Sequence, residues 1–89
     1  MKIICAASAG TLESSDAYVV IEPTTSGNAI QIESVVMEQF GDAIEQAVRE
    51  VLREQSVDNA SVRIIDRGAL DCVIRARVET ALLRGGEKV

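Results

Sequence analysis

Two adjacent hydroxyls, Ser14 and Ser15, stand between the carboxylates of Glu13 and Asp16 in the stretch GTLESSDAYVV. A serine hydroxyl becomes a nucleophile when a neighbouring group removes its proton, and the chain has no histidine to do so. An exposed serine can nevertheless accept a group from a partner that brings its own catalyst. From composition alone a polar turn is the simpler interpretation, because serine and aspartate are common turn residues.

Other catalytic chemistry is scarce in the sequence. Without histidine, the chain lacks the usual acid–base group at neutral pH and the commonest metal ligand. Asp66 and Asp71 come from different segments than the carboxylates beside the serines, and no spacing enforces a carboxylate pair. Neither a GxGxxG nor a P-loop pattern occurs. We therefore expect no catalytic residue, no metal site and no nucleotide site, with the carboxylates acting as caps and solvated charges.

Length, composition and charge argue against nucleic-acid-binding, membrane-spanning and secreted proteins. With 89 residues, 47% apolar and 26% charged, we expect one small folded domain. The net charge of -5 opposes binding to nucleic acid or to anionic membranes, and one Phe, one Tyr and no Trp give no stacking platform for single strands. No apolar stretch approaches the roughly 18 residues of a membrane span, and the apolar part of MKIICAASAG is too short for a secretory signal. These features favour a cytoplasmic protein.

The two cysteines, Cys5 and Cys72, match no zinc or redox spacing. We expect both to be small buried residues rather than a disulfide or a reactive thiol, which fits a reducing compartment.

The serines precede a predicted strand at about 17–22, because AYVVI is β-branched and aromatic and Pro23 closes it. The turn formers PTTSGN and the alternating stretch AIQIES follow, which predicts a hairpin of two antiparallel strands. A short strand at Ile3 to Ala7 is also predicted ahead of the serines.

Helical spacing begins after this hairpin. A helix is predicted at about 35–54, with Ser34 as its N-cap and Glu45 to Arg49 as an i,i+4 pair. Its apolar stripe comprises Met37, Phe40, Ile44, Ala47, Val48, Val51 and Leu52.

A third strand is predicted at about 60–65 and a second helix at about 69–84, whose apolar residues begin at Leu70. The sequence therefore predicts an α+β two-layer sandwich, in which two amphipathic helices cover a small sheet made of a hairpin and a further strand. We expect one domain over residues 1–89, with an ordered core from about residue 9 to 84 and a flexible tail at 85–89.

Three stretches in order carry a more specific signal: AGTLESSD (9–16), QFGDAI (39–44) and RGALDCVIRARVE (67–79). Together they resemble the acyl carrier protein, or gamma chain, of citrate lyase. The resemblance extends from about residue 9 to residue 84. One of these motifs alone is weak, whereas three in the same order are specific.

This resemblance implies a carrier subunit of a cytoplasmic complex that splits citrate into acetate and oxaloacetate. Members of that family carry 2'-(5''-phosphoribosyl)-3'-dephospho-coenzyme A, bound through a phosphodiester to the serine of a Thr-Leu-Glu-Ser-x-Asp motif. That serine corresponds to Ser14, and Ser15 occupies the variable position. Glu13 and Asp16 either are read by the enzyme that installs the group or keep the loop solvated, and the sequence does not decide between these two roles.

The resemblance also implies the partners. They are the alpha subunit, which exchanges acetyl for citryl on the arm, the beta subunit, which cleaves the citryl thioester, and the prosthetic-group transferase. The chain itself would supply no catalytic residue. The opening MKIICAA and the tail RGGEKV depart from the family pattern, which affects contacts made by the two ends.

Four arginines are candidates for contacts with the phosphates of such an arm, because arginine pairs well with phosphate: Arg63, Arg67, Arg75 and Arg77. Phosphate contact is our hypothesis for Arg67 and Arg77. The simpler interpretation is a solvated helix surface with ordinary pairs from Asp71 to Arg75 and from Arg75 to Glu79.

Two alternatives remain open from the sequence. One is the related delta chain of malonate decarboxylase, which carries the same kind of group. The other is an acidic protein-interaction domain without a prosthetic group.

Overall fold

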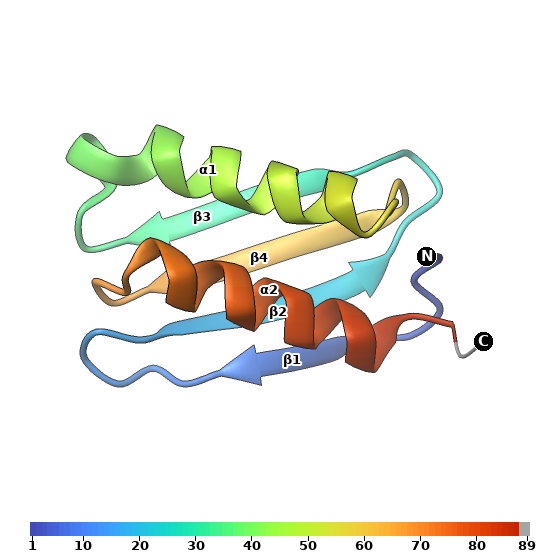
Figure 1. Cartoon of the computed structure of the whole chain (residues 1–89), viewed down its shortest axis with the longest axis horizontal. Coiled ribbons are helices and arrows are strands. Elements are labelled where there is room, and N and C mark those ends of the chain that lie inside the picture. Colours follow the sequence, from blue (N-terminus) through green and yellow to red (C-terminus); the bar gives the residue numbers. More distant parts are fainter. Residues whose placement is uncertain (88–89) are drawn as a thin grey trace.

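A four-stranded mixed sheet forms one layer of the structure, and two helices form the other (Figure 1). The computed structural model describes residues 1–87. In chain order the elements are β1 (Ala7–Gly10), β2 (Ala17–Pro23), β3 (Ala29–Ser34), α1 (Met37–Glu54), β4 (Ala60–Asp66) and α2 (Asp71–Gly85). This architecture confirms the predicted α+β two-layer sandwich.

The predicted pairing of β2 with β3 in a hairpin is wrong. The strand order is β1-β2-β4-β3, so β4 lies between the two, antiparallel to β2 and parallel to β3. The physical reason is burial: inward residues of β2 and β4 are fully buried, whereas β3 alternates between exposed and half-buried positions. The strands that bury most take the central places, and the more polar β3 takes an edge.

The first strand lies later in the chain than predicted. The segment from Ile3 to Ala7 is mostly irregular, and β1 pairs antiparallel with β2 from Ala7 to Gly10. Ile3 instead forms an isolated bridge with Gly86, and the Asn59 amide holds its backbone, accepting from its N–H at 3.0 Å and donating to its carbonyl at 2.9 Å.

The predicted flexible tail begins at the last residue of α2, and its flexibility stays a prediction. Gly85 ends α2, and the Glu87 N–H donates to the Lys2 carbonyl at 2.8 Å. The last part of the predicted tail, residues 88–89, lies outside the described residues.

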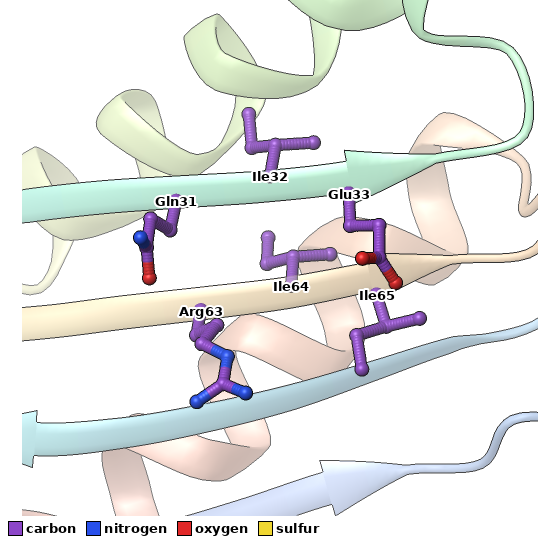
Figure 2. Close-up of a pocket in the computed structure, with 6 residues that line it drawn as sticks. All are labelled: Gln31, Ile32, Glu33, Arg63, Ile64 and Ile65. Atoms are coloured by element: carbon purple, nitrogen blue, oxygen red, sulfur yellow. The ribbon is translucent and has the colours of Figure 1, made fainter.

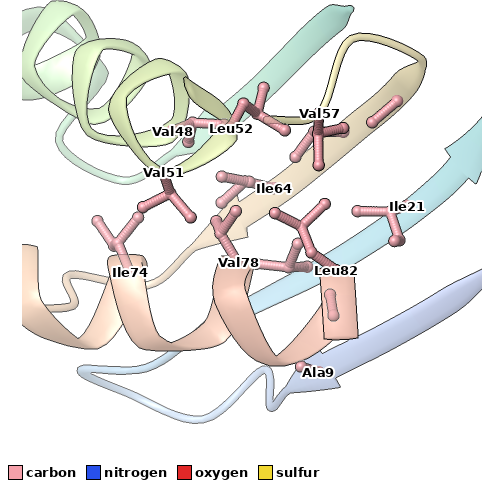
Figure 3. Packing of buried hydrophobic residues seen from close by; sticks show 14 of the residues in the cluster. Ala9, Ile21, Val48, Val51, Leu52, Val57, Ile64, Ile74, Val78 and Leu82 are labelled. Carbon is pink, nitrogen blue, oxygen red and sulfur yellow. The ribbon is translucent and has the colours of Figure 1, made fainter. Parts of the chain in front are cut away.

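The core lies between the helices and one face of the sheet (Figure 3). Side chains alternate along the strands, so every second residue of β2 and β4 points to the helices. Burying an aliphatic side chain stabilises the fold by about 1.5 to 3 kcal/mol. The largest apolar side chains that are fully buried are Ile3, Ile21, Leu52, Ile64, Leu82, Val19, Val48, Val62 and Val78.

The start of α1 differs from the prediction. Ser34 is not its N-cap, because Val36 occupies that position and the helix begins at Met37. Ser34 ends β3, where its hydroxyl donates to Asp66 at 2.7 Å and accepts from the Val36 N–H at 3.0 Å. Two members of the predicted apolar stripe, Met37 and Phe40, are exposed, because the beginning of α1 lies at the end of the sheet (Figure 1).

The prediction of buried cysteines is also wrong. Both Cys5 and Cys72 are free and exposed. Cys5 lies in the irregular segment before β1, and Cys72 lies on the outer side of the first turn of α2, so neither faces the core.

The buried carboxylate of Asp66 is a first test of this fold. Asp66 is 1% exposed and accepts from the Ser34 hydroxyl at 2.7 Å and the Ala69 N–H at 2.9 Å. We expect Asp66→Ala to lower the free energy of unfolding by about 1 to 3 kcal/mol, because it leaves both donors without this acceptor. Urea denaturation measures this, and Asp58→Ala, at an exposed position, is the control, with a change within about 0.5 kcal/mol. Equal effects of the two changes would contradict the assigned role.

Candidate functional site

The two serines lie in the loop that joins β1 to β2, at the end of the sheet where both helices begin (Figure 1). Gly10 ends β1 with a φ of 94°, a conformation that side chains other than glycine rarely adopt. A Cβ at this position would lie 1.9 Å from the Ala17 carbonyl oxygen. The glycine therefore allows the two ends of the loop to approach closely.

The loop itself is a tight turn with Ser14 at its tip. The Asp16 N–H donates to the Glu13 carbonyl at 3.2 Å, which closes a four-residue turn. Ser15, the third residue of the turn, has a φ of 65°, whereas Ser14 is not among the residues with positive φ. Both serines are exposed.

Asp16 holds the loop together through its carboxylate. Arg77 of α2 donates to it through Nε and Nη2, each at 3.0 Å, and the Thr11 hydroxyl donates at 2.7 Å. The Ala17 N–H donates at 2.7 Å. The side chain of Asp16 is 15% exposed. The hydrogen bond from Arg77, followed by that from Thr11, holds the Asp16 pKa well below its ordinary value of 3.8.

The backbone of Arg67 fixes the loop from the other side. The Ser15 N–H donates to the Arg67 carbonyl at 2.9 Å, and the Arg67 N–H donates to the Asp16 carbonyl at 2.9 Å. The loop is therefore attached both to α2 and to the connection between β4 and α2. The side chain of Arg67 is exposed beside it.

The structure places the predicted residues in different ways. Ser14 and Glu13 are exposed on the turn, whereas Asp16 is directed into the network that holds it. The roles of Glu13 and Asp16 in recognition by an enzyme stay predictions. Because Arg77 is engaged by Asp16, its contact with a phosphate loses support, while Arg67 remains a candidate.

Helix-surface pairs account for Arg75. The predicted pair with Asp71 is present at 2.6 Å, and Glu50 of α1 adds a second at 2.8 Å. Within residues 1–87 the ion pairs include none from Arg75 to Glu79, whereas the predicted pair of Glu45 with Arg49 is found at 3.0 Å.

Sequence reasoning missed Thr11 and the reach of Arg77 across the loop. Thr11 also accepts from the Glu13 N–H at 3.2 Å, and a threonine two residues ahead of a turn is a signal that was available. The contact of Asp16 with Arg77 spans 61 residues of sequence, so no local pattern could show it.

This arrangement suits an acceptor better than a catalyst. The nearest side-chain carboxylate in the network, Asp16, already accepts from four donors, and its lowered pKa makes it a weak base. Asp16 is therefore poorly suited to remove a proton from the hydroxyl of Ser14.

A separate depression lies on the open face of the sheet, over β3 and β4 (Figure 2). It has a volume of about 300 Å³ and is lined by Gln31, Glu33 and Arg63 together with backbone and side chains of their neighbours. None of these residues belongs to the serine loop. No group of three or more potential metal ligands occurs within residues 1–87, and none of the helices in that range is long and apolar enough to cross a membrane.

The lowered Asp16 pKa predicts how the loop responds to acid. Because the folded-state pKa lies below the ordinary value of 3.8, the carboxylate stabilises the fold fully above that value. Its contribution is lost as the pH falls through the folded-state pKa. We expect the unfolding free energy of the wild type to exceed that of Asp16→Asn by a constant amount from about pH 7 to about pH 5, and by less at lower pH.

Denaturation of the two proteins between about pH 7 and about pH 2 checks this. A difference that stays constant or grows under acid would contradict the role of the carboxylate.

Known proteins resemble this chain along nearly its whole length. Residues 5–85 match the family described as malonate decarboxylase delta subunit (MdcD). Citrate lyase acyl carrier protein 2 of Salmonella paratyphi A is 52% identical over 89 residues, which cover 99% of this chain and 92% of that protein. The citrate lyase acyl carrier protein of Haemophilus influenzae is 50% identical over 88 residues, with 99% and 92% covered.

A solved structure shares the fold. It is a crystal structure of a Pseudomonas malonate decarboxylase hetero-tetramer in complex with malonate, with a TM-score of 0.81 and 25% identity, covering 92% of this chain and 84% of that chain. The chain thus shares its fold with one chain of that hetero-tetramer. The chain belongs to the citrate lyase acyl carrier proteins, whose wider family includes the delta subunit of malonate decarboxylase.

Proposed function

We propose that this chain is the acyl carrier subunit of citrate lyase and that Ser14 is its attachment site. The observation that carries the proposal is the exposed Ser14 hydroxyl at the tip of a turn that Asp16 and Arg77 hold in place. The chain is 50 to 52% identical to citrate lyase acyl carrier proteins over 99% of its length. The carrier has no catalytic role of its own.

The proposed group is 2'-(5''-phosphoribosyl)-3'-dephospho-coenzyme A, covalently attached. The residues present fit this group. The oxygen of the exposed Ser14 can form the phosphodiester bond, and the exposed side chain of Arg67 beside the turn can pair with a phosphate of the group. When bound, the group supplies a thiol that holds acetyl or citryl as a thioester. The chain holds the arm through Ser14 and orients the turn through Asp16, Arg77 and Thr11.

The proposed partners are the alpha and beta subunits of citrate lyase and the transferase that installs the group, in the cytoplasm. A covalent tether converts each encounter of the acyl group with a partner's active site into an intramolecular one at a high effective concentration. This role needs a stable small domain with an exposed acceptor, and it needs no base or metal on the carrier.

A carrier subunit of malonate decarboxylase is the second candidate. The family match and the shared fold with a malonate decarboxylase hetero-tetramer favour it. The identity to that structure is 25%, about half of that to the citrate lyase carriers, so we prefer citrate lyase. The reconstituted complex should be assayed with both substrates. Cleavage of citrate without decarboxylation of malonate supports citrate lyase, and the reverse result supports malonate decarboxylase.

The attachment site is tested by changing each serine separately. In cells that also make the modifying enzymes, attachment of the group increases the mass of the wild-type chain. We expect Ser14→Ala to abolish this increase and to abolish citrate cleavage by the complex. Its unfolding free energy should change by no more than about 0.5 kcal/mol, because the residue is exposed. The control is Ser15→Gly, since glycine adopts the positive φ of this position without strain.

Intact mass spectrometry followed by peptide mapping provides the measurement. Modification of Ser15→Gly at the normal level supports Ser14. If the Ser14→Ala chain is still modified, the attachment site is not Ser14, and the neighbouring hydroxyl of Ser15 becomes the candidate. If the wild type is not modified by a transferase that is proven active on another carrier, the carrier function is refuted. The alternative of an acidic interaction domain then stands.

A further inference from the structure

Exposed apolar side chains gather at the end of the domain that carries Ser14. Seven large apolar residues are exposed within residues 1–87, and five of them lie in the serine loop, the start of α1 or the start of α2. Figure 1 shows these three segments at one end, opposite the chain termini. We call these five residues the serine-end surface: Leu12, Val35, Met37, Phe40 and Leu70.

A groove with a volume of about 370 Å³ is part of this surface. Phe40 of α1 and Leu70, just before α2, both line it and are 52% and 70% exposed. Ile74 and Ala69 also line it, so its walls are mostly apolar. A groove of this kind receives an apolar anchor side chain from a partner, which is how central contacts of protein interfaces are made.

The groove is physically joined to the serine turn. Ser15 and Asp16 are hydrogen-bonded to the backbone of Arg67, at 2.9 Å in each case, and the next residues, Gly68 to Leu70, line the groove. An enzyme that forms a bond to the Ser14 oxygen must bring its active site onto this turn. The rim of that active site then necessarily meets the surface around the turn.

Charge indicates the chemistry of the partner. The exposed carboxylates of Glu13 and Glu38 lie in the serine loop and the first turn of α1, and the chain carries a net charge of -5. Ion pairs within residues 1–87 involve Glu45, Glu50, Asp71 and Asp16, and neither Glu13 nor Glu38 is among them. Arg67, beside the turn, is exposed and carries a positive charge. A partner with lysine or arginine around an apolar contact complements this surface.

We propose that the serine-end surface is the docking site of the enzyme that modifies Ser14, with the Phe40–Leu70 groove receiving an apolar side chain of that enzyme. This inference rests on the proposed attachment at Ser14. It explains why apolar residues that the helical pattern assigns to the core, such as Met37 and Phe40, remain at the surface.

The test measures modification of Ser14 at increasing carrier concentrations, with purified transferase and its donor substrate, followed by intact mass spectrometry. The variants are Phe40→Gln and Leu70→Ser. Serine is favoured at the N-cap position that Leu70 occupies, and glutamine is a good helix former, so both variants should fold. The control is Leu83→Gln, because Leu83 is also 52% exposed but lies at the other end of α2.

We expect each variant to raise the KM for the carrier at least about tenfold, a loss typical of a central interface contact, with kcat little changed. Leu83→Gln should behave as the wild type. Increasing salt should raise the KM of the wild type if basic residues of the enzyme face the carboxylates. Circular dichroism and thermal unfolding confirm that the variants are folded.

Normal KM values for both variants, or an equal loss in Leu83→Gln, would overturn the docking site. If both variants are modified normally and NMR signals near Leu70 shift only after modification, the groove holds the carrier's own arm and the proposal is wrong. A wild type that is not modified at all, despite an active transferase, refutes the proposed function and this inference with it. A modified wild type with unaffected variants refutes the inference alone.

Discussion

The insertion of β4 between β2 and β3 is the constraint on which the rest of the structure depends. It places the fully buried residues of β4 at the centre of the sheet. It also places Asp66, the last residue of β4, beside Ser34, the last residue of β3 before the connection to α1. The carboxylate of Asp66 then joins that end of β3 to the start of the next connection, through Ser34 and Ala69. As a result the serine loop and the beginnings of both helices meet at one end of the domain (Figure 1).

The serine turn combines an exposed serine with a hydrogen-bonded support. Ser14 is free of the network, whereas Asp16 binds Arg77, Thr11 and the loop backbone and ties the turn to α2. The turn is therefore positioned by side chains other than that of Ser14. Asp16 itself is not suited to remove a proton, since a strongly held carboxylate with a lowered pKa is a poor base.

The apolar residues at the serine end illustrate a conflict between stability and recognition. Burying Phe40 or Leu70 would add to the core, but both remain accessible around a groove. In the proposed docking site these side chains stay accessible to the modifying enzyme, which could not contact them if they were buried.

The sequence by itself determined the fold class and the approximate bounds of β2, β4 and both helices, because these depend on local periodicity and turn chemistry. It indicated Ser14 as the candidate residue only through the resemblance of three short stretches to a known family. Only the tertiary structure decided that β4 separates β2 from β3, that Ser34 serves Asp66 instead of capping α1, and that Phe40 stays exposed. It also joined Asp16 to Arg77 across 61 residues. Such features follow from which strands compete for the centre of the sheet and which distant side chains then meet, and no local pattern encodes that competition.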